Sequence, residues 1–180
     1  MLNRSARTKR PSAGSAVGAE PPAPSDEAAD RAAAYRTAVR LLERRPYARR
    51  DLGRRLGLKG HRPEDVEVAL DRAEQAGYLD DTRFATQFVE TRSARGRGPA
   101  RLRRELSMMG VANQIVDQVL AAGEADPAEA AARISELIAK RRRQLAGLPA
   151  ADARRRLVAF LARRGYTGPE VMRLVRDRLL

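Results

Sequence analysis

The chain has 180 residues, of which 43% are apolar and 4% aromatic, and it carries a formal net charge of +13. It contains no cysteine and one histidine, which excludes disulfide bonds, thiolate metal sites and metal sites built from several histidines. No apolar run approaches the roughly 20 residues of a membrane span, and the N-terminus lacks the apolar core of a signal peptide. We therefore expect a soluble, cytoplasmic protein.

The excess of positive charge predicts a polyanionic partner, meaning nucleic acid, an acidic protein surface or a nucleoprotein complex. Arginine accounts for 33 of the 36 basic residues, a preference that GC-rich coding would also produce. Coding bias explains arginine over lysine but not the excess of basic over acidic residues. The anionic partner is therefore the interpretation that we favour.

Residues 1–29 are rich in Pro, Gly, Ser and Ala and contain almost nothing that a core could bury. This composition predicts a disordered tail. Its four basic and three acidic residues nearly cancel, so the excess positive charge belongs to the folded remainder.

From residue 30 onward the apolar periodicity is helical, and several prolines stand at helix starts. No alternating run of strand type occurs, so we predict an all-α fold. The expected helices span residues 30–44, 47–57, 63–76, 81–95, 99–109, 112–122, 127–145, 149–164 and 168–179.

These helices fall into three groups with the same internal order. In each group a helix with leucines at i and i+4 ends on a glycine, and an apolar-faced helix follows; the matched glycines, Gly60, Gly110 and Gly165, are 50 and 55 residues apart. The pattern predicts an elongated tandem array of three three-helix units, at residues 30–79, 80–124 and 125–180. In the third helices we match the pairs Val66 and Leu70, Ile115 and Val119, and Val171 and Val175.

The stretch AGYLDDTRFATQFVETR, residues 76–92, concentrates residues that shape the backbone. We expect Gly77 to end a helix and Tyr78 to fold back over its last turn. Asp80 is placed to cap the next helix, and Asp81 lies in its first turn, at the positive end of the helix dipole.

Leu79 and Phe84 have the spacing of a hydrophobic staple across the start of that helix. The third unit repeats the device in GYTGPEV, with Thr167 and Glu170 as a capping box and Tyr166 with Val171 as the staple. Two adjacent carboxylates are compatible with acid/base catalysis, but no histidine, nucleophile or phosphate-binding loop accompanies them. We interpret the stretch as a structural joint and predict no catalytic, cofactor-binding or metal-binding residues.

Two motifs, one across the boundary of the first and second units and one within the second, resemble the RecX family of recombination regulators. The first is GYLDDTRFA, matched at Gly77, Tyr78, Leu79, Asp80, Asp81, Arg83, Phe84 and Ala85. The second is RGRGPARLRRELSMMGV, matched at Gly98, Pro99, Leu102, Leu106 and Gly110. The resemblance covers about residues 30–180; Ala112, where a better helix cap is expected, and Tyr47 depart from it.

The resemblance implies a regulator of the recombinase RecA, active in homologous recombination, DNA repair and the SOS response. It implies binding along the groove of the RecA–single-stranded DNA filament and inhibition of filament growth, ATP hydrolysis, strand exchange and co-protease activity. Single-stranded DNA is then a partner directly or through RecA. We expect a monomer that is not an enzyme and uses no cofactor.

Clusters of basic residues are the candidate contacts, although charge runs are usually solvated helix faces. The first cluster surrounds Gly96 and Gly98, which we interpret as a flexible approach to the following helix, with Glu105 as the nearby acid: Arg92, Arg95, Arg97, Arg101, Arg103 and Arg104. The second is Lys140, Arg141, Arg142 and Arg143. We interpret a third, Arg154–Arg156 with Arg163 and Arg164, as solvated, and His61 as an exposed bystander.

The alternative function is a stand-alone DNA-binding protein of helix-turn-helix type, whose second helix enters the major groove. Such proteins usually carry Asn, Gln or Ser beside their arginines to recognise bases. Here the candidate faces are nearly all arginine, which suits phosphates or acidic protein better.

Overall fold

The computed structural model describes residues 26–124 and 126–179, so the predicted tail lies outside the described residues up to position 25. All regular structure in the described residues is helical, which confirms the all-α prediction. The helices are α1 (Asp26–Arg44), α2 (Arg49–Leu58), α3 (Pro63–Gln75), α4 (Asp81–Ser93), α5 (Pro99–Met108), α6 (Asn113–Gly123), α7 (Pro127–Arg143), α8 (Ala150–Arg164) and α9 (Pro169–Leu179).

Helix α1 begins four residues before its predicted start at Asp30. Asp26 and Glu27 lie in its first turn, where carboxylates interact favourably with the positive end of the helix dipole. The apolar periodicity of the sequence could not reveal this turn, because its residues are exposed and none of its side chains enters a core.

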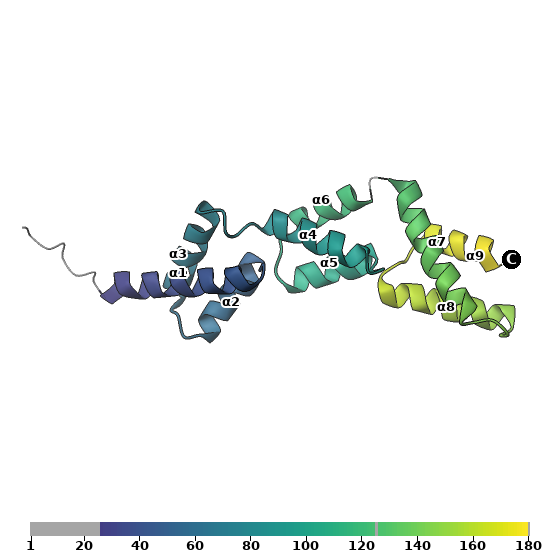
Figure 1. Cartoon of the computed structure of the whole chain (residues 1–180), viewed down its shortest axis with the longest axis horizontal. Helices are drawn as coiled ribbons and strands as arrows, with labels where there is room; N and C mark the ends of the chain where they lie inside the picture. Colours follow the sequence, from purple (N-terminus) through teal and green to yellow (C-terminus); the bar gives the residue numbers. More distant parts are fainter. Residues whose placement is uncertain (1–25, 125, 180) are drawn as a thin grey trace, which may run out of the picture.

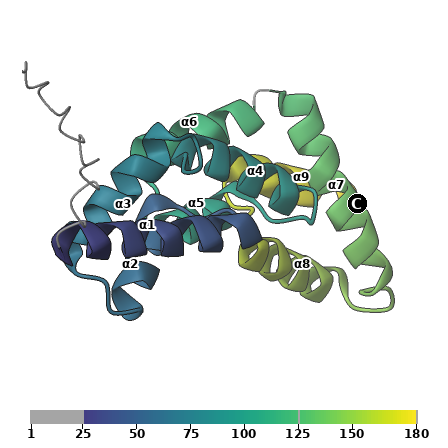
Figure 2. The ribbon, with the colours of Figure 1, turned by 60° about the vertical axis from the view of Figure 1, so that its left-hand side comes forward.

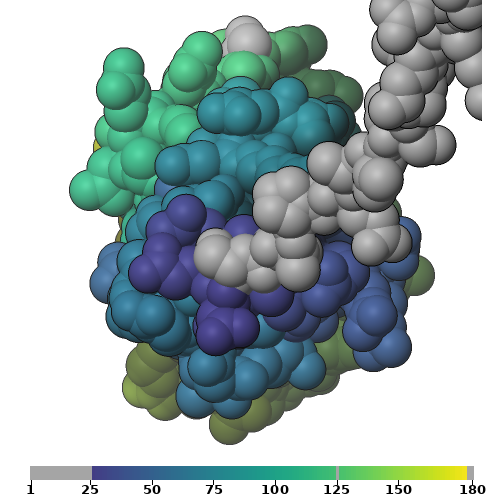
Figure 3. All heavy atoms as spheres, turned by 90° about the vertical axis from the view of Figure 1, so that its left-hand side faces the viewer, coloured from purple at the N-terminus to yellow at the C-terminus, as the bar shows by residue number. Residues whose placement is uncertain are grey.

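The helices form three units of three, α1–α3, α4–α6 and α7–α9, which follow one another along the long axis (Figure 1). A view turned by 60° shows the same order of units (Figure 2), and a view from the N-terminal end shows the first unit in front of the later ones (Figure 3). Each unit has its own buried cluster, centred on Leu52, Leu56 and Leu70 in the first, Leu102, Leu106 and Val116 in the second, and Leu157, Leu161 and Val175 in the third. The predicted tandem array is therefore confirmed.

The three matched glycines take the same left-handed backbone conformation, with φ of 87° at Gly60, 84° at Gly110 and 90° at Gly165. Residues with a Cβ rarely adopt this conformation, which explains glycine at these turns. The match we predicted for the second unit is wrong by one residue. Val116 and Leu120 are buried there, whereas Ile115 is half-buried, so the repeat distance of 50 holds throughout the first two units.

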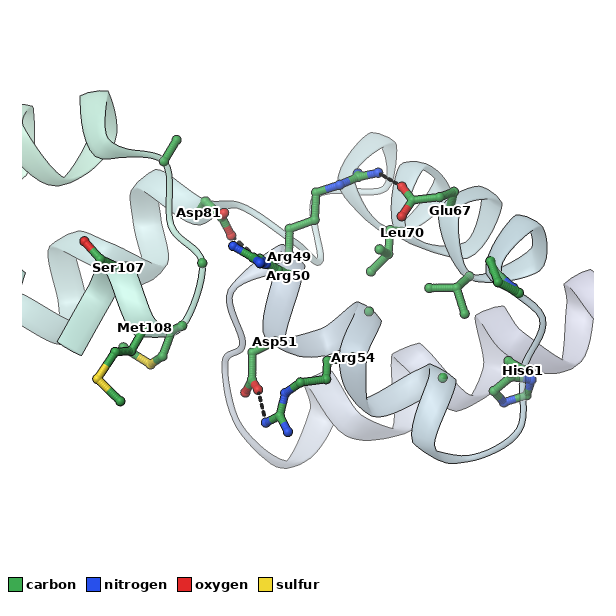
Figure 4. A pocket seen from close by; sticks show the side chains of 17 residues that line it. Arg49, Arg50, Asp51, Arg54, His61, Glu67, Leu70, Asp81, Ser107 and Met108 are labelled. Carbon is green, nitrogen blue, oxygen red and sulfur yellow. Dashed lines mark hydrogen bonds and ion pairs between the residues drawn. The ribbon is translucent and has the colours of Figure 1, made fainter. Parts of the chain in front are cut away.

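The two adjacent carboxylates of the stretch at residues 76–92, Asp80 and Asp81, cap two different helices. Asp80 Oδ1 accepts a hydrogen bond from the backbone N–H of Arg83 at 2.9 Å, which confirms the predicted cap of α4. Asp81 Oδ1 accepts one from the backbone N–H of Arg49 at 2.7 Å, and Arg49 is the first residue of α2 in the preceding unit (Figure 4). The motif is therefore a joint, and Asp81 contributes to it across the unit boundary.

Other details of the motif differ from expectation. The Tyr78 N–H donates to the Ala73 carbonyl, but the Tyr78 side chain is 55% exposed and does not cover the helix end. Leu79 is buried in the first core and Phe84 is half-buried against the second, so these two side chains anchor neighbouring units. Ala48, just before α2, is likewise fully buried in the second core.

Two further expectations need correction. His61 is half-buried and its Nε2 lies 3.1 Å from Thr37 Oγ1, so it links α1 to the α2–α3 turn rather than standing free. In the third unit α9 begins at Pro169, so Gly168 and not Thr167 precedes the helix. None of the helices in the described part of the chain has the length and apolar character that a membrane crossing requires.

Candidate anion-binding site

The second and third units meet through their backbones. The Gly98 N–H donates to the Arg164 carbonyl at 2.7 Å, and the Ala100 N–H donates to the Gly165 carbonyl at 3.2 Å. A Cβ on Gly98 would lie 2.6 Å from the Gly165 carbonyl carbon, and one on Gly165 would lie 2.4 Å from the Arg101 nitrogen. Both positions therefore require glycine, and the predicted flexible approach at Gly98 is instead a packed joint.

Arginine side chains complete this joint by donating to carbonyl oxygens. Arg164 Nη1 donates to the carbonyls of Arg95 at 3.3 Å and Gly96 at 3.2 Å. Arg101 Nη1 donates to the Arg163 carbonyl at 3.3 Å. Gly96, like Gly98, is therefore held by the third unit.

Half of the first predicted basic cluster, three arginines, shares one carboxylate, that of Glu105. Arg97 Nη1 lies 2.5 Å and Arg101 Nε 2.9 Å from its oxygens, and Arg92 Nη1 lies at 3.7 Å. Burial alone would raise the pKa of Glu105, but the hydrogen bonds and charges of Arg101 and Arg97 outweigh it and lower the pKa. These arginines are held by the fold, and Glu105 offsets part of their charge.

The remaining arginines of that cluster differ from one another. Arg103 is paired with Asp117 on α6. The side chains of Arg95 and Arg104 have no hydrogen bond or ion pair with the described residues. Only Arg95 of these two lines a cavity.

That cavity is a cleft of about 440 Å³ between the second and third units. Arg95 comes from the turn after α4, Arg164 from the end of α8, and Arg133, Lys140 and Arg141 from α7. Five cationic side chains and one carboxylate, that of Glu136, line it among the described residues, a net charge of +4. The cleft therefore favours anions.

Three of the five cations of the cleft are held by groups that leave their charge in place. Arg164 donates to backbone carbonyls, Arg133 Nη2 donates to the Gly123 carbonyl at 3.1 Å, and Arg141 donates to the amide oxygen of Gln144. The nearest carboxylate to Arg133, that of Glu129, lies at 3.8 Å and is 71% exposed, which makes the pair weak. The positive charge is thus positioned but not neutralised.

Two aromatic residues line the same cleft. The guanidinium carbons of Arg141 and Arg164 lie 5.3 and 4.8 Å from the centre of the Phe160 ring, within cation–π range. Burial raises the pKa of the Tyr166 phenol, and the nearby charges of Arg133 and Arg164 offset this only in part. The phenol therefore stays neutral and adds no negative charge to the cleft.

The structure brings together predicted residues from two clusters, namely Arg95, Lys140 and Arg141. Arg143 is exposed and lines a different, shallow cavity with Arg142. Sequence reasoning missed Arg133 and assigned Arg164 to a solvated face. The spacing of Arg133, Lys140 and Arg141 at i, i+7 and i+8 places them on one side of α7, and this was the available signal.

The fold and these charges define an all-helical repeat protein with a cationic cleft at one joint. Within the described residues no group of three or more His, Asp or Glu side chains is placed to hold a metal ion. Models of the RecX family match the chain in three places: the first three-helix domain at residues 34–72, the second at 80–120 and the third at 128–175.

Curated relatives and solved structures agree with this match. The chain is 42% identical over 136 residues to the regulatory protein RecX of Halorhodospira halophila, covering 74% of this chain and 81% of the relative. It is 38% identical over 148 residues to that of Pseudomonas entomophila, covering 81% and 92%. The crystal structure of RecX from Lactobacillus salivarius superposes with a TM-score of 0.75 at 14% identity, covering 83% of this chain and 97% of that one, which shows the shared fold. The chain belongs to the RecX family of regulatory proteins.

Proposed function

We propose that this chain regulates the recombinase RecA by binding the RecA–single-stranded DNA filament and limiting its growth, ATP hydrolysis, strand exchange and co-protease activity. Membership of the RecX family over three successive domains is the observation that carries the proposal. The elongated array adds support, because a row of similar units suits a partner whose subunits also repeat (Figure 1).

The candidate contacts in this proposal are the cations that the fold leaves unmatched. Arg95, Lys140 and Arg141 share the cleft between the second and third units, and Arg104 is exposed on α5. Arg92, Arg97 and Arg101 instead stabilise the joint through Glu105, so their part in binding is indirect.

The test is a titration of the full chain into RecA that is hydrolysing ATP on single-stranded DNA. We expect hydrolysis to fall as the chain is added and to fall further with longer incubation if filament growth is blocked. Unchanged hydrolysis over a range that saturates binding to naked DNA would contradict regulation of RecA. That outcome would favour the stand-alone DNA-binding function.

A further inference from the structure

We infer that the cleft between the second and third units binds carboxylate side chains of an acidic peptide segment on a protein partner, rather than a nucleic-acid strand. The inference rests on the proposed function in one respect: the segment would belong to the protein component of the filament. Three features of the cleft support the inference: the way its cations are held, the state of its aromatic rings and its size.

Three of the five cations of the cleft, Arg133, Arg141 and Arg164, are oriented before any ligand arrives. Arg164 and Arg133 are oriented by backbone carbonyls and Arg141 by the Gln144 amide, so little side-chain freedom is lost on binding. A guanidinium presents two parallel N–H groups that match a carboxylate or a phosphate. An anion of either kind would therefore meet a positioned set of donors.

One donor beside the cleft has no partner. Arg141 Nε is the buried side-chain nitrogen or oxygen that lacks a hydrogen bond in the described part of the chain. Leaving such a group unpaired is unfavourable. Arg141 is therefore oriented by Gln144 but keeps unused hydrogen-bonding capacity beside the cleft.

The aromatic residues argue against a nucleic-acid strand. Proteins that bind single strands generally stack bases on exposed aromatic rings, in addition to holding the phosphates. Here the guanidiniums of Arg141 and Arg164 already lie over the Phe160 ring, and Tyr166 is only 8% exposed. The cleft offers charge without an open stacking surface.

The size of the cleft points in the same direction. A cavity of about 440 Å³ between two units accommodates a few side chains, and a double helix is too broad to enter it. In a single strand each phosphate carries a sugar and a base on either side. The carboxylates of Asp and Glu stand at the ends of slim side chains and reach the cations without such bulk.

The test compares a fluorescein-labelled oligoglutamate peptide with an oligothymidylate strand of equal charge, each titrated into the full chain at physiological salt. The double variant Arg95→Ala with Lys140→Ala removes two cleft charges whose side chains have no partner among the described residues. The matched control, Arg36→Ala with Arg40→Ala, removes two exposed charges on α1, in the first unit and away from the cleft.

We expect the cleft variant to weaken peptide binding about tenfold or more and the control to change it by less than about threefold. Strand binding should respond equally to the two variants, as a property of net charge. Equal losses of peptide binding in both variants, or a loss confined to the strand in the cleft variant, would overturn the inference.

The RecA titration separates this inference from the proposed function. If RecA is inhibited but the peptide binds no better through the cleft than elsewhere, the inference fails alone. If the cleft binds the peptide but RecA hydrolysis is unaffected, the proposed function fails and the acidic segment belongs to another protein.

Discussion

The ionic clusters at the two joints of the array have opposite charge arrangements. At the first joint Arg49 is surrounded by three carboxylates, those of Glu67, Asp71 and Glu74, at 2.7 to 2.8 Å. Next to the second joint one carboxylate, Glu105, is surrounded by three arginines. Carboxylates therefore outnumber arginines around Arg49, whereas arginines outnumber carboxylates around Glu105.

The cavities at the two joints follow the same division. Three arginines and three carboxylates line the cleft of about 1000 Å³ at the first joint, together with apolar side chains such as Leu70 and Met108 (Figure 4). The cleft at the second joint carries a net charge of +4. The charges that line the first cleft therefore balance, whereas those that line the second leave an excess of positive charge.

The two joints also differ in how closely their backbones pack, and a graded series of glycine substitutions tests this difference. Gly165→Ala forces a Cβ to within 2.4 Å of the Arg101 backbone nitrogen, in a left-handed conformation. We expect a loss of about 2–5 kcal/mol in the free energy of unfolding, from backbone strain and overpacking together. Denaturant unfolding followed by circular dichroism measures it.

The control is Gly60→Ala, which has the same conformation but nothing within 4 Å of the new Cβ, so strain alone should cost about 1–2 kcal/mol. Gly110→Ala should lie between the two, because its Cβ meets the flexible side chain of Arg50. Equal losses for Gly60→Ala and Gly165→Ala would show that the second joint does not depend on close backbone contact.

Removing the Glu105 carboxylate should have the next largest effect on the free energy of unfolding. Glu105→Ala leaves Arg92, Arg97 and Arg101 facing one another without an anion, which should cost about 1–3 kcal/mol at neutral pH. Glu136→Ala is the matched control, since this carboxylate lines the cleft without a partner among the described residues, and we expect a change within about 0.5 kcal/mol. Thermal unfolding of both variants shows whether Glu105 stabilises the fold or behaves as an ordinary surface carboxylate.

The first joint depends on the two capping carboxylates. Asp80→Ala and Asp81→Ala should each cost about 0.5–2 kcal/mol, because each leaves a helix N-terminus without its side-chain acceptor. Amide hydrogen exchange distinguishes them: Asp81→Ala should speed exchange at Arg49 in the first unit, and Asp80→Ala at Arg83 in the second. Exchange at Arg49 that is unaffected by Asp81→Ala would contradict the cap across the units.

Lowering the pH should change the stability contributions of Glu105 and Asp81 in opposite directions. The pKa of Glu105 is lowered from its ordinary value of 4.5, so its stabilisation is complete above that value and is lost as the pH falls through the lower folded pKa. Burial raises the pKa of Asp81 above 3.8, despite the hydrogen bond and charge of Arg49, so this carboxyl favours the folded state more as the pH falls.

This effect is the smallest and is measured as a difference. The gap in unfolding free energy between the parent chain and Glu105→Gln should narrow below about pH 4.5, whereas the corresponding gap for Asp81→Asn should not narrow. A gap for Glu105→Gln that stays constant into strong acid would mean that its three arginines contribute no net stabilisation.

Much of the fold could be predicted from the sequence because its determinants are local. Prolines at helix starts, glycines after helix ends and leucines at i and i+4 define the elements, as Pro99, Gly110, Leu102 and Leu106 illustrate in the second unit. The cap at Asp80 follows from the same local rules.

The candidate site could be predicted only in part, because pairing of charges is not local. Arg97 meets Glu105 only after the chain turns at Gly98, and Arg164 reaches the Gly96 carbonyl from 68 residues away. Sequence proximity grouped Arg95 with Arg97, although the fold leaves the first without a carboxylate partner and pairs the second with Glu105. The role of Asp81 was missed for the same reason, since its partner lies 32 residues earlier.

We propose that arginines paired with Glu105 hold the fold, whereas the unmatched cations of the cleft make the regulatory contact. The most direct measurement compares Arg97→Ala with Arg101→Ala against Arg95→Ala with Lys140→Ala, two double variants of equal charge, for thermal unfolding and for inhibition of RecA-catalysed ATP hydrolysis. We predict a lower unfolding temperature for the first pair, and for the second an unchanged unfolding temperature with an inhibitory concentration raised about tenfold or more. The reverse pattern, with inhibition lost in the first pair at full stability and retained in the second, would contradict the account.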